Sequence, residues 1–177
     1  AMGQQHGERL KDRIVSFVDV RFAAMEIYTR DRGRSTGSQG VMDIGRASLA
    51  IYADWDPDGY QELKGIAMGA GLSPDVLYTA TNMTDMRDVL LLSDAPPDAE
   101  GCSSLVVSPG LTADGHALAG QTWDLNPSDI DYVVAIRRKP TEGLQTWTVT
   151  CAGCHTLVGF NESGLALGTT NIKTAGS

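Results

Sequence analysis

A chain of 177 residues with 42% hydrophobic side chains is long enough to bury one sizeable core, which excludes disorder as its main state. Its formal net charge is −8, with basic residues adjoining only at 137–139, so the concentrated positive surface that nucleic acids need is not expected. No run of eighteen apolar residues predicts a membrane span. Three cysteines, at 102, 151 and 154, are too few for a secreted disulfide framework, and the N-terminus shows no signal-peptide pattern. A cytoplasmic location is expected.

The first part of the chain, from Gly7 to about Asp94, has the three- and four-residue spacing of helices. The first helix is expected to turn one stripe inward, formed by Leu10, Ile14, Phe17, Val18, Arg21, Met25 and Tyr28. A glycine-rich loop is then expected over 33–40, followed by a helix over 43–54 that buries Ile44, Ala47, Ile51 and Trp55.

Two further helices have clear boundary signals. One begins at Pro57 and ends at Gly69-Ala70-Gly71, where the glycines stop it. The next begins at Ser73-Pro74-Asp75, which supplies a cap, a proline at the first helical position and an acid in the first turn. It is expected to reach about Leu92, before an acidic, proline-bearing connector over 94–100.

After this connector the pattern changes to that of strands. Short segments rich in β-branched and aromatic residues alternate with turn signals such as Asp114-Gly115 and Glu142-Gly143. They predict one antiparallel meander with strands over 103–108, 117–123, 132–138, 145–151, 156–161 and 165–171. The chain is therefore of the α+β class, with a helical part over 1–101 and a sheet part over 102–177 that lacks a second layer.

Gly101-Cys102, at the boundary of the two parts, has the chemistry of a site where a chain cuts itself. Gly101 leaves its carbonyl carbon unshielded by a Cβ atom, and the thiol of the next residue can attack that carbon. Cleavage would give Cys102 a free α-amine, whose ordinary pKa is about 8. That amine can act as a base for the adjacent thiol.

The chain resembles the acyl-coenzyme A:6-aminopenicillanic acid (isopenicillin N) acyltransferase family of N-terminal-nucleophile (Ntn) hydrolases. The resemblance covers nearly the whole chain. It is carried by Gly3-Gln4-Gln5-His6-Gly7, Tyr60 to Gly69 (YQELKGIAMG), Gly101-Cys102-Ser103-Ser104, Gly120-Gln121-Thr122-Trp123-Asp124 and Gly159 to Ala166 (GFNESGLA). Members of that family run about twice this length and fold as a four-layer αββα sandwich, so the resemblance implies that only part of the fold lies in this chain.

The resemblance implies an amidohydrolase or N-acyltransferase that needs no cofactor or metal. Cys102 matches the self-released nucleophile, Asp124 the aspartate that holds the nucleophile's α-amino group, and Asn171 the asparagine that donates to the oxyanion. Gln121 takes the place of an arginine in the bile salt hydrolase branch, Thr122 replaces the usual asparagine, and Ser103 and Asn161 are supporting residues. The implied partner is a small-molecule amide or acyl substrate.

Each of these residues also has a purely structural interpretation. Cys102 fits a cysteine packed at the start of a strand, Asp124 a turn cap and Asn171 a turn residue, while His6 and His116 fit structural roles best. Cys151-Ala152-Gly153-Cys154-His155 has the spacing of a covalent haem site and offers soft metal ligands. Its place between two strands favours neither a haem nor a metal.

A second hypothesis is that this chain is not catalytic by itself. It would then be an uncleaved precursor or a fragment that needs a second polypeptide to complete the sheet. In one variant the cut follows Ser177, so that the nucleophile opens the next chain. Self-association of this chain into a homo-oligomer is also compatible with the sequence.

Overall fold

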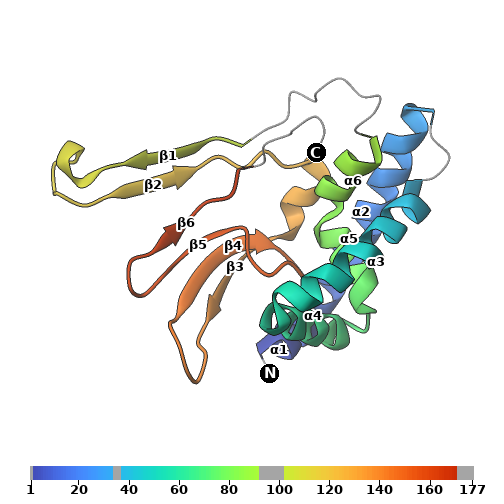
Figure 1. Ribbon diagram of the computed structural model, residues 1–177, viewed down its shortest axis with the longest axis horizontal. Coiled ribbons are helices and arrows are strands. Elements are labelled where there is room, and N and C mark those ends of the chain that lie inside the picture. The colour runs from blue at the N-terminus through green and yellow to red at the C-terminus, as the bar shows by residue number, and fades with distance from the viewer. Residues whose placement is uncertain (1, 34–36, 92–101, 171–177) are drawn as a thin grey trace.

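The computed structural model describes residues 2–33, 37–91 and 102–170. Helices form the first part and antiparallel strands the second, which confirms the α+β class (Figure 1). The helices are α1 (Met2–Arg9), α2 (Lys11–Asp31), α3 (Gly37–Trp55), α4 (Pro57–Ala70), α5 (Pro74–Thr81) and α6 (Met83–Leu91). The strands are β1 (Ser104–Val107), β2 (Leu118–Gln121), β3 (Val133–Arg138), β4 (Thr146–Cys151), β5 (Val158–Asn161) and β6 (Ala166–Leu167), with 3₁₀ turns η1 (Pro109–Leu111) and η2 (Pro127–Tyr132).

The hydrophobic core lies in the helical part. Its main cluster joins α2, α4 and α5 and contains fully buried Ile14, Leu63, Ile66 and Leu77. A second cluster joins α2, α3 and α6 and consists of Met25, Val41, Met83 and Met86. The inward stripe expected on α2 is buried at Ile14, Phe17, Val18, Arg21 and Met25 and half-buried at its two ends.

Helices α1 and α4 contact each other backbone to backbone through glycines. A Cβ atom on Gly3 would overlap the Glu62 carbonyl oxygen, and one on Gly7 would overlap that of Ile66. On the facing helix, a Cβ on Gly65 would lie 2.9 Å from the Gln4 nitrogen. Side chains at these positions would force the helices apart, so the glycines of the Gly3–Gly7 and Tyr60–Gly69 segments are packing residues.

The boundaries of α4 follow the sequence signals. The Asp56 carboxylate caps it by accepting from the Gly59 N–H at 3.0 Å, Pro57 stands in the first turn, and Gly71 ends it with a φ of 76°.

The prediction for α3 was wrong in two respects. Helix α3 begins at Gly37 instead of Asp43, so part of the expected 33–40 loop is helical. Its inward face is also rotated from the expected one: Val41 and Gly45 are buried, whereas Ile51 and Trp55 are 71% and 81% exposed. The reason is tertiary, because Gly45 lets α3 approach α5 so closely that a Cβ there would overlap the Thr79 hydroxyl.

The helix expected from Pro74 to about Leu92 is divided at Asn82. Both the backbone N–H and the side-chain amide of Asn82 donate to the Tyr78 carbonyl, at 3.1 and 2.9 Å. The Thr81 hydroxyl donates to the Leu77 carbonyl at 3.0 Å. Side chains that bind nearby carbonyls compete with the regular helical pattern, which ends α5 here and starts α6.

The strands lie where the sequence predicts them, but they do not form one meander. β1 pairs only with β2, and β3, β4, β5 and β6 form a separate antiparallel sheet in that order. The segment between β2 and β3 forms η2, which begins at Pro127 and packs on α2. Proline at its start and the 3₁₀ turn keep β2 and β3 from pairing.

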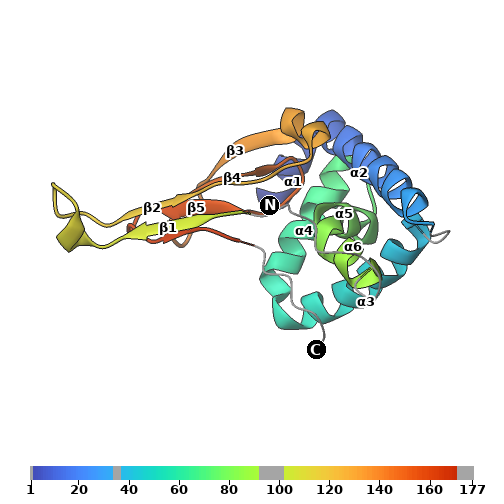
Figure 2. The same cartoon turned by 90° about the horizontal axis from the view of Figure 1, so that it is seen from above.

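Both sheets project away from the helices, as Figure 2 shows from above. Few strand residues are buried, and those that are lie on β4 close to the helical part: Thr148, Thr150 and Cys151. By contrast, Leu105, Val106, Leu118, Phe160 and Leu167 are 54–78% exposed. Over residues 102–170, the strand part therefore shows no core of its own.

Candidate functional site

Cys102 lines a cavity of about 480 Å³ between the helical part and the segments of the strand part that lie closest to it, over 123–129, 150–157 and 169–170. The residue is half-buried and lies two positions before the first residue of β1, Ser104. Asp124 lines the same cavity, as do Trp123 and Thr169. Two of the residues that the sequence predicts to be catalytic therefore lie at one cavity.

Hydrogen bonds fix the strand end that carries Cys102. The Ser103 N–H donates to the Thr122 hydroxyl at 2.9 Å, and the Thr122 N–H donates to the Ser103 carbonyl at 2.9 Å. Thr122, which replaces the usual asparagine, thus holds the chain next to Cys102. Asp124 follows two residues later, beyond the end of β2 at Gln121, and not on the neighbouring strand itself.

Gln121 joins the two sheets. Its side-chain amide donates to the Thr169 carbonyl and accepts from the Thr169 N–H, both at 2.6 Å, in the way that a peptide group would. Gly168 leaves the space for this contact, since a Cβ there would lie 2.6 Å from the Gln121 oxygen. Gln121 therefore ties the β1–β2 hairpin to the segment after β6, where Thr169 and Thr170 line the cavity.

No model of a known protein family matches the chain, and no curated protein matches it. Function therefore has to be inferred from the chemistry of the site. Within the described ranges, no helix is both long and apolar enough to cross a membrane.

Cys151 and Cys154 also line the cavity, and both are free thiols. Burial raises the pKa of Cys151 to about 12 and that of Cys154 to about 11. Both therefore stay protonated near neutral pH, and a protonated thiol is a poor nucleophile. Among residues 2–33, 37–91 and 102–170, no group of three or more His, Cys, Asp and Glu side chains is arranged to hold a metal ion.

His6 and His155 form a second group of titratable side chains, between the helices and the Cys151–Cys154 turn. The Gly153 N–H donates to Nε2 of His6 at 3.3 Å, which gives His6 a structural role. Burial lowers the pKa of His6 to about 4 and also lowers that of His155, so both rings are neutral near pH 7. Arg138 lies beside them and pairs with Glu62 at 3.0 Å.

The remaining predicted residues lie elsewhere or outside the described ranges. Asn161 does not line the cavity: its Oδ1 accepts from the Ser163 and Leu165 N–H groups, at 3.1 and 3.0 Å, and so closes the turn between β5 and β6. His116 is exposed and lies 3.6 Å from Asp114 in its turn. Gly101, Asn171 and the connector over 94–100 are outside the described residues.

A buried ion pair at the cavity was not predicted as part of the site. Nη1 of Arg21, on α2, lies 2.9 Å from Oδ2 of Asp129 in η2, and their side chains are only 10% and 3% exposed. Both residues line the cavity with Cys102 and Asp124. The sequence signal was an arginine on the inward stripe of α2, since a buried arginine needs a carboxylate partner.

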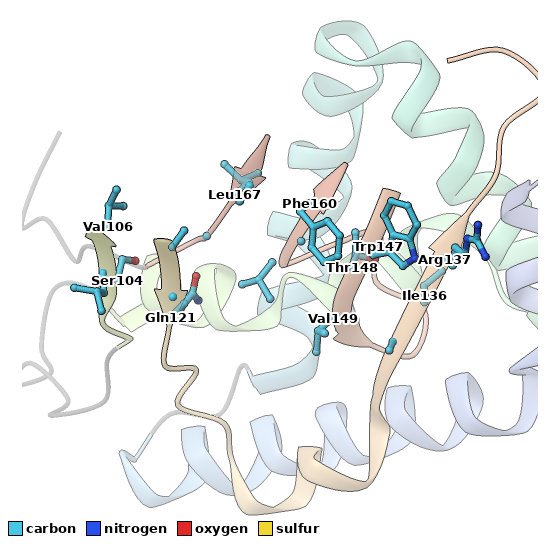
Figure 3. A pocket seen from close by; sticks show the side chains of 18 residues that line it. Ser104, Val106, Gln121, Ile136, Arg137, Trp147, Thr148, Val149, Phe160 and Leu167 are labelled. Carbon is cyan, nitrogen blue, oxygen red and sulfur yellow. The ribbon is translucent and has the colours of Figure 1, made fainter. Parts of the chain in front are cut away.

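A second hollow, of about 640 Å³, lies over the two sheets and is mostly apolar (Figure 3). Trp147 and Phe160 stack there with ring centroids 5.2 Å apart, and the Arg137 guanidinium lies 5.3 Å from the Trp147 ring. Val106 and Leu167 contribute from the flanking strands. It holds none of the predicted catalytic residues, so we assign it to packing.

Proposed function

We propose that this protein is a self-processing cysteine Ntn hydrolase or acyltransferase that cleaves or transfers an acyl group of an amide. The observation that supports the proposal most directly is that Cys102 and Asp124 line one cavity at the start of the first strand.

Processing would begin with attack of the Cys102 thiol on the Gly101 carbonyl carbon. The carbon–nitrogen bond breaks, the Cys102 nitrogen takes the proton of the thiol, and Gly101 is left as a thioester on Cys102. Water then hydrolyses the thioester, which frees the Gly101 carboxylate, the Cys102 thiol and an α-amino group.

The same thiol would next attack the amide carbonyl of a substrate. The α-amine takes the proton from the thiol and returns it to the leaving amine, so the acyl group remains as a thioester on Cys102. Water or an amine then accepts the acyl group. The Asp124 carboxylate would hold the α-ammonium group that forms in this step, which is the role the family resemblance implies.

The finer fold assignment belongs to the same proposal. An Ntn sandwich places a second sheet against the first, and the strand part here leaves large apolar side chains uncovered, including Val106, Phe160 and Leu167. Contiguous exposed apolar surface marks a site of packing or interaction. A second layer supplied by further residues or by another polypeptide would cover it.

Mass spectrometry of the purified full chain tests the proposal. We expect two pieces divided between Gly101 and Cys102, and no division in Cys102→Ala. Cys154→Ala is the matched control, because it changes another cysteine of the same cavity and should leave processing intact. An undivided wild-type chain that hydrolyses amides at full rate would overturn the mechanism.

The exposed strand part also favours a second candidate: a chain that is inactive until a partner polypeptide joins it. Sequencing the N-terminus of any co-purifying chain separates the two. A chain that begins with Cys102 supports the cut proposed here, whereas one that begins with Ser or Thr supports a nucleophile that follows Ser177.

A further inference from the structure

Arg21 binds three separate elements around the cavity. Its Nε donates to the Ala80 carbonyl of α5 at 3.3 Å, and its Nη2 donates to the Thr84 hydroxyl of α6 at 3.0 Å. Its Nη1 donates to Oδ2 of Asp129 in η2 at 2.9 Å. The guanidinium is a rigid planar group, so these three contacts fix α5, α6 and η2 relative to one another.

A short turn connects Asp129, which binds Arg21, to Asp124. The Asp129 N–H donates to the Asn126 carbonyl at 2.8 Å, and the Ser128 hydroxyl donates to Oδ1 of Asp129 at 3.2 Å. Pro127 lies inside this turn and fixes its own φ angle. Nδ2 of Asn126 also donates to Oδ2 of Asp129 at 3.4 Å, so the carboxylate that binds Arg21 also holds the residue two positions after Asp124.

We propose that Arg21 is a positioning residue that holds the Asp124 carboxylate in place for the α-amino group of Cys102. This inference rests on the function proposed above and adds the group that orients its aspartate. In this proposal Arg21 acts through Asp124 and does not itself touch the reacting atoms. Because its three nitrogens are occupied by Ala80, Thr84 and Asp129, its role is to organise the cavity wall.

The test compares Arg21→Lys with a matched control, Arg138→Lys, in the full chain. Lysine keeps the charge but cannot bind three partners in the fixed directions of a guanidinium. Arg138 suits the control because it also binds several partners, among them the Glu62 carboxylate at 3.0 Å and the carbonyl of His155, while its own side chain does not line the cavity. Unfolding midpoints establish that each variant folds.

Two readouts distinguish positioning from general stability. The first is the rate of cleavage between Gly101 and Cys102, followed by mass spectrometry. The second is the pH midpoint for alkylation of Cys102 by iodoacetamide, which peptide mapping measures. We expect Arg21→Lys to slow the division by about tenfold or more, since small displacements of catalytic groups cost rate steeply. Its alkylation midpoint should shift, whereas Arg138→Lys should stay close to the wild type in both.

Equal effects of Arg21→Lys and Arg138→Lys on both readouts, in chains that fold, would overturn the positioning role alone. A wild-type chain that is never cleaved, with a Cys102 alkylation midpoint that Asp124→Asn leaves unchanged, would overturn the proposed function and the positioning role with it. If Arg21→Lys fails to fold, Asp129→Asn replaces it, because it weakens the contact between Arg21 and the turn after Asp124 and keeps the size of the side chain. A several-fold slower division supports the proposal, and an unchanged rate contradicts it.

Discussion

The helical and strand parts of this protein bury their apolar side chains to very different degrees. Ile14, Leu63 and Leu77 are fully enclosed by helices, while Val106 and Leu167 on the strands are 78% and 65% exposed. Two-stranded hairpins and small sheets are marginal without a packed face, so the helical part supplies most of the stability that the described residues show. The strand part instead has the surface of an element that another layer covers.

The largest difference in unfolding free energy is expected when one large side chain is removed from the helical part and one from the strand part. Leu63→Ala should lower the free energy of unfolding by about 3 kcal/mol, because it leaves a cavity in the helical core. Leu167→Ala should cost less than about 1 kcal/mol, because that side chain is largely exposed. Urea unfolding followed by circular dichroism measures both, and equal losses would show that the strand part has a core of its own.

Glycine replacement sharpens the same contrast. Gly7→Ala should lower stability by about 2 kcal/mol, since the added methyl overlaps the Ile66 carbonyl oxygen of α4 and the gain in helix propensity offsets only part of the strain. Gly120→Ala on β2 is the control, because a Cβ there meets no atom within 4 Å. Its unfolding free energy should stay within about 0.5 kcal/mol of the wild type. A stable Gly7→Ala chain would contradict the close α1–α4 contact.

Acid should weaken the junction between the two parts. The folded pKa of His6 is about 4, below the ordinary value of 6.5, so the unfolded chain binds more protons between those two values. The stability contributed by neutral His6 is complete above pH 6.5 and is lost as the pH falls toward 4. The lowered pKa of the Asp75 carboxyl adds a further loss only below about its ordinary value of 3.8.

Urea midpoints measured from pH 7 to pH 4.5 check this effect. They should fall with pH in the wild type and fall less steeply in His6→Phe, which has no ring proton to gain. His116→Gln should keep the wild-type slope, because the His116 side chain is 80% exposed. A slope that His6→Phe leaves unchanged would assign the pH dependence to other groups.

The smallest effect on stability is expected from a charge on the strand part. Val106→Lys should change the unfolding free energy by less than about 0.5 kcal/mol, because Val106 is 78% exposed. It should nevertheless lower the binding of a hydrophobic dye such as ANS. Dye fluorescence that does not change would show that this surface is not accessible in solution.

Much of the strand part and two helix boundaries could be predicted because their signals are local. Turn glycines at 115, 143 and 164 adopt positive φ angles, and Gly71 ends α4 in the same way. The inward face of α3 could not be predicted, because it depends on how closely Gly45 lets α5 approach. The separation of the two sheets depends on η2, whose packing against α2 is equally non-local.

The candidate site was predictable in part for the same reason. Cys102 and Asp124 are short distances along the chain from paired strands, so their meeting at one cavity follows from local pairing. Arg21 is far from both in sequence, and its partner Asp129 lies 108 positions away. Only the fold identifies which carboxylate neutralises that arginine.

The two arginine–carboxylate pairs at the junction have one further consequence. Arg21 and Glu62 precede the Gly101–Cys102 bond, whereas their partners Asp129 and Arg138 follow it. If that bond is cut, each piece contains one arginine and one carboxylate whose partners lie in the other piece. Separating the pieces would therefore break both ion pairs together. Separation would also uncover Ala152 of the strand part, which is fully buried in the core cluster of the helices, and exposing apolar surface to water costs free energy. The two pieces should therefore stay together under native conditions and separate only when the protein is denatured.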